Sequence, residues 1–274
     1  MFDLILAFVV VLVLLISSII DIKTREVPDE LSLGLIIFAV ILKVIQAYFS
    51  GWGILMASLI GFAVFLGISL VMYYSRQWGG GDAKLFMAIG IALPYFPEKL
   101  SFLNPNISAN FLLIIFINTL LFGFVYGMGY ITYLYYKNKL KIKFKAKRHF
   151  LLMSIALVIA SLFFDPELRI LILILALIVL VYPYLIILTR EVEKKILTYR
   201  MKVNKLTEGD WIIKDVKIGN KLIYSRKNPG VTKKQIDLLK KLRIKEVLVK
   251  EGIPFVPAIF LGVLSSVVFG GILF

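Results

Sequence analysis

The chain has 274 residues, of which 60% are hydrophobic, and a formal net charge of +15. Soluble domains contain roughly 45–50% apolar residues, so this composition and the repeated long apolar runs predict a polytopic membrane protein. The absence of cysteine and the single histidine, His149, exclude disulfides, thiol nucleophiles, cysteine-ligated metal sites and two-histidine zinc proteases.

The first predicted element is a transmembrane helix. Residues Leu4 to Ile20 are almost all apolar, and they lack the basic segment and the small-residue cleavage site of a signal peptide, so we expect a retained helix. Several later apolar runs approach the roughly 20 residues that a spanning helix needs, and two are shorter. The later runs are Leu31–Phe49, Ile54–Tyr74, Ala83–Leu93, Phe111–Tyr136, Phe150–Phe164, Leu168–Leu188 and Phe255–Phe274. We therefore predict six to eight transmembrane helices.

Asp21 ends the first apolar run and begins the polar stretch DIKTREVPDE. An aspartate that ends a helix at the membrane interface is common, so Asp21 alone favours no function. The stretch also carries Glu26, Asp29 and Glu30, whose negative charge we expect to attract a basic ligand. Within the next run, Lys43 is expected to extend toward the outer interface.

A second polar stretch, QWGGGDAKL, separates two apolar runs. Glycine is a poor helix former and an aspartate is costly at membrane depth, so stability alone does not explain this pattern. Gly79, Gly80 and Gly81 predict either positive φ angles or the close approach of another backbone, such as that of an extended peptide. Asp82 is then either a catalytic carboxylate or an N-terminal cap of the following helix.

The distribution of charge predicts the orientation in the membrane. The loop Lys137–Arg148 holds seven Lys and Arg residues and the stretch Arg190–Lys250 holds eighteen, whereas the alternating loops around Glu98 and Asp165 hold one each. The positive-inside rule places the basic loops in the cytoplasm. The net charge is thus a topology signal and an attraction to the lipid bilayer, and it indicates no nucleic-acid partner.

The stretch after residue 190 predicts a small soluble domain. The segments DWIIKDV and NKLIYS alternate like strands around a turn at Gly219 and Asn220, and TKKQIDLLKKL has helical spacing. We therefore expect a transmembrane helical domain at residues 1–189, a cytoplasmic α+β domain at residues 190–252 and a C-terminal transmembrane helix at residues 253–274. The fold class is an α-helical polytopic membrane protein with a small cytoplasmic α+β domain.

This topology brings the two polar stretches to one face of the membrane. If the first helix runs from outside to inside, Asp21 lies at its cytoplasmic end, and Asp82 begins the fourth helix on the same side. Two neighbouring carboxyl groups share a proton, so that one activates water while the other polarises a substrate carbonyl. Such an aspartyl dyad needs no metal and no cofactor.

These residues also carry a family resemblance. Gly79-Gly80-Gly81-Asp82 matches the GxGD motif of intramembrane aspartyl proteases, and residues 21–29 resemble the first-aspartate stretch of type IV prepilin peptidases. The segment IPFVPAIFLG is similar to the Pro-Phe-x-Pro segment that opens a late helix in that family. The resemblance implies support of substrate binding by Pro254, Pro257 and Ala258, although these prolines are equally typical of a helix start.

The late insertion of about 60 residues and the lack of cysteine resemble the archaeal preflagellin peptidases. The resemblance implies an aspartic-type endopeptidase in the plasma membrane, with its active site facing the cytoplasm. Its expected partner is a preflagellin or prepilin-like precursor, from which it removes a short basic leader. Two alternatives stay open: a signal peptide peptidase-like protease that cuts inside a membrane segment, and an ion-coupled transporter that uses the same carboxylates.

Overall fold

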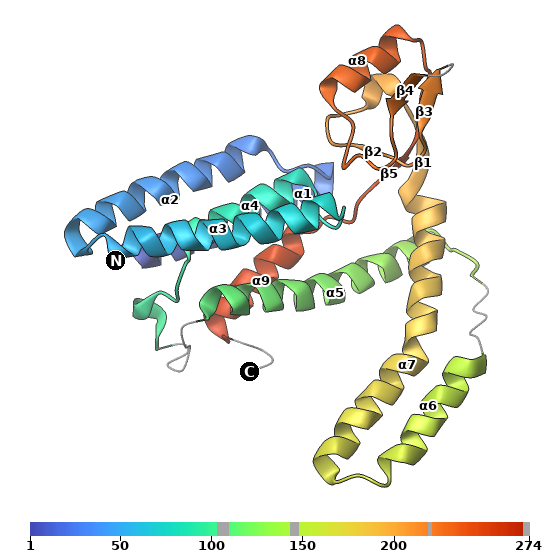
Figure 1. Cartoon of the computed structure of the whole chain (residues 1–274), viewed down its shortest axis with the longest axis horizontal. Coiled ribbons are helices and arrows are strands. Elements are labelled where there is room, and N and C mark those ends of the chain that lie inside the picture. The colour runs from blue at the N-terminus through green and yellow to red at the C-terminus, as the bar shows by residue number, and fades with distance from the viewer. Residues whose placement is uncertain (103–109, 143–147, 219–220, 271–274) are drawn as a thin grey trace. The chain divides into compact units, whose positions relative to one another are not determined.

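A computed structural model describes residues 1–102, 110–142, 148–218 and 221–270 of the protein (Figure 1). The elements in chain order are α1 (Phe2–Thr24), α2 (Asp29–Ser50), α3 (Gly53–Tyr74), α4 (Gly80–Ala92), η1 (Glu98–Leu100), α5 (Phe111–Lys137), α6 (Arg148–Ser161), α7 (Pro166–Val192), η2 (Glu193–Leu197), β1 (Thr198–Lys202), η3 (Val203–Lys205), β2 (Trp211–Ile212), β3 (Val216–Ile218), β4 (Lys221–Tyr224), α8 (Lys233–Lys241), β5 (Glu246–Lys250) and α9 (Val256–Val268). The turn predicted at Gly219 and Asn220, and the end of the last predicted helix at residues 271–274, lie outside the described residues.

Five helices in the described residues are long and apolar enough to cross a membrane: α1, α2, α3, α5 and the helix at Pro166–Leu197. The prediction of a polytopic helical membrane protein is therefore confirmed. Three of the predicted spans form shorter helices, with 13 residues in α4, 14 in α6 and 13 in α9. At about 1.5 Å per residue, each covers about 20 Å, less than the roughly 30 Å hydrocarbon core of a bilayer.

The chain forms two compact units, one made of Met1–Gly127 with Arg200–Phe274 and the other of Met128–Tyr199. In the second unit, α6 and α7 pack as a helical hairpin (Figure 1). The hydroxyl of Ser154 donates a hydrogen bond to the carbonyl of Ala176 at 3.0 Å, which satisfies a polar group inside this apolar pair.

In the first unit, α4 packs against α2 and α3, and α1 packs against α9, which lies far from it in the sequence (Figure 1). Gly61 of α3 and Gly90 of α4 face each other so closely that a Cβ atom on either would collide with the backbone of the other. Small residues allow this approach, as is typical of membrane helices that associate by close packing. The side chains of Phe65 and Phe86 stack beside this contact, with ring centroids 4.1 Å apart. This core fixes the position of α4, whose first turn carries Asp82.

Residues 200–250 of the first unit form a small group of strands and helices, called here the α+β part. Strands β1, β5 and β2 form one sheet in that order, β3 and β4 form a separate antiparallel hairpin, and α8 adds a helix. Thr232 and Gln235 make a reciprocal capping box, which explains why α8 begins where it does. The buried residues around Leu239 give this part its own apolar core. Its last strand, β5, leads directly into the segment before α9.

The structure shows that the side chain of Lys43 is only 1% exposed and is paired within the protein. Its Nζ lies 2.7 Å from Oδ1 of Asp3 and 4.7 Å from the centre of the Tyr95 ring. The side-chain amide of Gln46 donates a second hydrogen bond to Asp3 at 2.9 Å. A buried charge persists in an apolar core when a partner neutralises it, and Asp3, near the start of α1, is that partner.

We expect the substitution Lys43→Leu to destabilise the protein without changing the catalytic rate of the folded fraction. Removing one partner of a buried pair costs roughly 3–5 kcal/mol, and the partial exposure of Asp3 favours the lower end. Thermal unfolding in detergent should therefore shift down by roughly 6–12 °C. Lys99→Leu, at an exposed position, is the control. Equal midpoints for the two variants would show that the pair does not stabilise the fold.

Candidate active site

Asp21 lies in the last turns of α1 and is 5% exposed. The helix ends because Arg25 adopts a left-handed conformation with φ of 62°, and its N–H donates to the carbonyl of Asp21 at 2.9 Å. The Oδ2 atom of Asp21 accepts a hydrogen bond from the N–H of Val256 at 3.1 Å. Val256 is the first residue of α9, where the N–H groups have no partner within the helix. The start of α9 therefore supplies a backbone donor to a buried carboxylate.

Asp82 lies in the first turn of α4 and is partly exposed. Its Oδ2 atom accepts a hydrogen bond from the N–H of Gly79 at 2.8 Å, so the carboxylate also caps this helix. The position at a helix N-terminus is favourable for a negative charge. Val27, in the loop after Asp21, packs on Gly81, so the end of α1 and the start of α4 lie at one site. The structure thus brings together the two aspartates that the sequence singled out, and it shows a capping contact for Asp82 as well.

The three glycines before Asp82 do not have the positive φ angles that the sequence suggested as one possibility. Among the described glycines, such angles occur at Gly51, Gly209 and Gly270. Gly81 does allow a close contact within the chain, since a Cβ atom there would lie 2.7 Å from Cβ of Val27. A Cβ atom on Gly80 would meet only the Tyr73 ring, at 3.9 Å. The close neighbour of Gly81 in the structure is thus a residue of the first-aspartate stretch.

The two polar stretches are joined by a second contact. Nζ of Lys84, two residues after Asp82, lies 2.6 Å from Oδ1 of Asp29. Together with the packing of Val27 on Gly81, this ion pair holds the start of α2 against the start of α4. Asp29 is therefore engaged within the chain, and Glu26 is too, because its Oε1 atom accepts a hydrogen bond from the hydroxyl of Thr207 at 2.8 Å. These contacts weaken the expectation that both residues attract a basic ligand.

Pro254, just before α9, and Pro257 and Ala258, in its first turn, are buried. Proline is favoured in the first turn of a helix, and Pro257 follows Val256 there. Phe255 packs on Trp78, with ring centroids 5.5 Å apart. The segment therefore places a donor at Asp21.

Several contributors were not identified from the sequence. Val256 acts through its backbone, so its side chain carries no signal. Val27 and Trp78 lie in the motif stretches, but only the fold shows that Val27 contacts Gly81 and that Trp78, 1% exposed, packs beside the site. Among the described residues, no three His, Asp or Glu side chains are grouped so that they could hold a metal ion.

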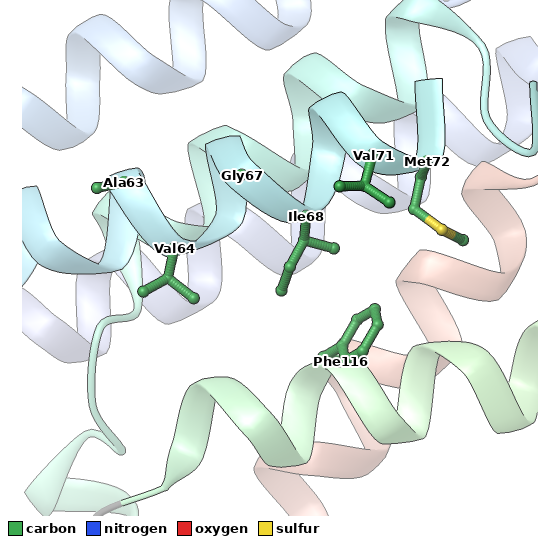
Figure 2. A pocket seen from close by; sticks show the side chains of 7 residues that line it. All are labelled: Ala63, Val64, Gly67, Ile68, Val71, Met72 and Phe116. Carbon is green, nitrogen blue, oxygen red and sulfur yellow. The ribbon is translucent and has the colours of Figure 1, made fainter. Parts of the chain in front are cut away.

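An apolar groove of about 420 Å³ lies beside this site between α3 and α5. It follows α3 from Ala63 to Met72, and Figure 2 shows Ile68 and Met72 pointing toward Phe116 of α5. At its Met72 end, the carbonyl of that residue accepts hydrogen bonds from the N–H groups of Gln77 and Trp78, at 2.9 and 3.2 Å. The groove therefore ends where the glycine-rich stretch begins.

Comparisons with known proteins agree with the predicted resemblance. Residues 8–130 match the model of the type IV leader peptidase family. The chain is 29% identical over 115 residues to a preflagellin peptidase of Methanococcus maripaludis, a match that covers 40% of this chain and 50% of that protein. It is 34% identical over 82 residues to a preflagellin peptidase of Methanocaldococcus jannaschii, covering 30% of this chain and 35% of that protein. The chain thus spans at most half the length of these relatives. The family match includes Asp21 and Asp82 but not the segment at Val256.

Proposed function

We propose that this chain, whose residues 8–130 match the type IV leader peptidase family, is a membrane-embedded aspartyl endopeptidase. It removes the short basic leader from preflagellins or prepilin-like precursors at the cytoplasmic face of the plasma membrane. The observation that carries the proposal is the packing of Val27, in the loop after Asp21, on Gly81, which places the two aspartates of separate helices at one site. The names of the two relatives support the substrate class, and the basic loops support the orientation.

In the proposed mechanism, the two carboxyl groups share one proton. The ionised group takes a proton from a water molecule, and this water attacks the carbonyl carbon of the scissile bond. The protonated group donates to the carbonyl oxygen and, as the bond breaks, a proton passes to the leaving amine. The Val256 N–H fixes the orientation of the Asp21 carboxylate, and the Gly79 N–H fixes that of Asp82. Both groups are therefore oriented before substrate binds.

The groove supports a substrate whose scissile bond lies next to an apolar, membrane-embedded segment. From Ala63 to Met72 the groove follows α3 for about 14 Å, roughly half of the hydrocarbon thickness. Its lining is apolar, and it ends at the residues that lead to Asp82. A helix that enters the bilayer directly after the cleaved bond could follow this groove. A lipid chain is the competing occupant.

The proposal is tested by incubating the detergent-solubilised protein with a precursor that carries a basic leader followed by an apolar segment. Mass spectrometry of the products should show one cut, just before the apolar segment. A cut inside that segment would support the signal peptide peptidase-like alternative. Absence of cleavage, together with cation flux in proteoliposomes, would support the transporter alternative.

For the groove, we expect Gly67→Leu to impair the processing of this precursor. A Cβ atom on Gly67 meets nothing within 4 Å, so the larger side chain fits the fold but occupies the groove. The KM of the precursor should rise about tenfold, the effect of roughly 1.4 kcal/mol of lost binding. A peptide that spans the scissile bond but lacks the apolar segment should be cut as before.

The matched control is Gly34→Leu on α2, another exposed glycine with open space around its Cβ position. This variant lies outside the groove and should process the precursor with an unchanged KM. If the two leucine variants behave alike, the apolar segment of the substrate does not use the groove, which a lipid then fills.

A further inference from the structure

The donor to Asp21 belongs to a segment whose other end is also fixed to α1. The segment Glu251–Val256 leads from β5 to α9 and lies outside the residues that match the family model. At its end, the N–H of Val256 donates to Asp21. At its beginning, Nη1 of Arg25 donates to the carbonyl of Gly252 at 3.1 Å. The Nε atom of Arg25 lies 3.5 Å from Oε1 of Glu251.

Asp21 and Arg25 are four residues apart, so they occupy successive turns at one end of α1. Asp21 and Arg25 both bind the segment Glu251–Val256. They are also linked to each other, because the backbone N–H of Arg25, which has a left-handed conformation, donates to the carbonyl of Asp21. A shift of the segment at the Arg25 end would therefore move the Val256 N–H relative to the Asp21 carboxylate.

The small α+β part makes a second contact with the same loop. The hydroxyl of Thr207 donates to Glu26 at 2.8 Å, and the N–H of Thr207 is itself held by Oδ2 of Asp210 at 2.8 Å. The loop after α1 is thus held on two sides by residues that follow β1. The side chains of Arg25 and Glu251 are 23% and 32% exposed, so their ion pair is partly shielded from water.

We propose that Arg25 is a positioning residue that holds the Glu251–Val256 segment in the register that places the Val256 N–H on Asp21. The α+β part accordingly contributes to the geometry of the active site, because the segment that follows β5 supplies the donor to Asp21. This inference rests on the proposed function, because it assumes that Asp21 is catalytic. Its physical basis is the sensitivity of catalysis to geometry, since a displacement of about 1 Å can reduce a rate by about 10²-fold.

The test measures kcat and KM for leader removal by purified variants. Arg25→Ala should lower kcat by about 10- to 100-fold and change KM less than twofold, because the dyad is displaced while the substrate surfaces remain. Arg25→Glu and Glu251→Arg should each lower kcat, and the double variant with both reversals should recover part of it. A role in stability alone would lower the thermal midpoint without lowering the kcat of folded protein. Lys195→Ala, which removes a different ion pair with Glu191 on the protein surface, is the control and should keep the wild-type kcat.

The proposal is overturned if Arg25→Ala keeps the wild-type kcat, or if the double reversal is no more active than the poorer single variant. Should Arg25→Ala not fold, Glu251→Gln takes its place, since it removes one charge and keeps the side-chain size. A several-fold lower kcat supports the proposal, and an unchanged kcat contradicts it. Failure of the proposed function is recognised separately, because the wild-type protein would then release no leader, or Asp21→Asn would release it at the wild-type rate.

Discussion

Asn in place of either Asp21 or Asp82 should abolish leader removal, with a loss of at least about 10³-fold in kcat. General acid and base catalysis each contribute roughly 10²- to 10⁴-fold, and an amide can perform neither step because it does not ionise or exchange the shared proton. The measurement is the rate of product formation by each purified variant in detergent, followed by mass spectrometry.

The same substitution separates catalysis from helix capping. Asp82 accepts a hydrogen bond from the N–H of Gly79, and an asparagine oxygen at this position can accept the same bond. Because that bond is kept, the Asp82→Asn variant should be folded, with a thermal midpoint close to the wild type. A well-folded Asp82→Asn protein with near wild-type activity would falsify the catalytic assignment and leave the cap as the role of this residue.

Gly81→Ala should reduce cleavage by about 10²-fold. The added Cβ would lie 2.7 Å from Cβ of Val27, so the first turn of α4 and the loop after Asp21 must separate by several tenths of an ångström or more. Catalytic groups respond strongly to displacements of this kind, and this one acts on the relative position of the two aspartates. The measurement is kcat with the same precursor, because substrate binding should change less than the chemical step.

Two further variants make this prediction specific. Gly80→Ala is the matched control, since its Cβ atom has room beside the Tyr73 ring at 3.9 Å, and it should keep most of the activity. Adding Val27→Gly to Gly81→Ala removes the opposing Cβ atom and should restore part of the rate. Equal losses for the two alanine variants, with no recovery in the double variant, would show that the glycines act through flexibility rather than close packing.

The sequence predicts that the helix ends carrying Asp21 and Asp82 share one face of the membrane. Apolar runs of membrane length and the alternation of basic and neutral loops place Asp21 and Asp82 together, because each spanning helix must reverse the direction of the chain. The structure is consistent with this placement, since Val27, in the loop after Asp21, packs on Gly81. The helical membrane fold and its strand-containing part were likewise predictable from hydrophobic periodicity.

The supporting contacts were not predictable, because they join residues that no local pattern relates. The bond from Val256 to Asp21 spans 235 positions in the sequence and uses a backbone group that every residue except proline has. The partner of Lys43 is Asp3, 40 positions earlier, and a lone lysine in an apolar run gives no sign of it. The length of the lysine side chain predicts that Lys43 extends toward the outer interface. The packing of α1 on α2 shows in addition that it forms a buried ion pair.

The central claim is that Asp21 and Asp82 act as one catalytic dyad. Its most direct test compares the two single Asn variants with the double variant that carries both substitutions. Because two carboxyl groups that share a proton act as one unit, Asp21→Asn, Asp82→Asn and the double variant should have residual rates within a few-fold of one another. These rates can be compared by long incubations with one precursor and quantitative mass spectrometry of the released leader. Losses that multiply in the double variant would show that the two aspartates act independently, and the account of a shared dyad would be wrong.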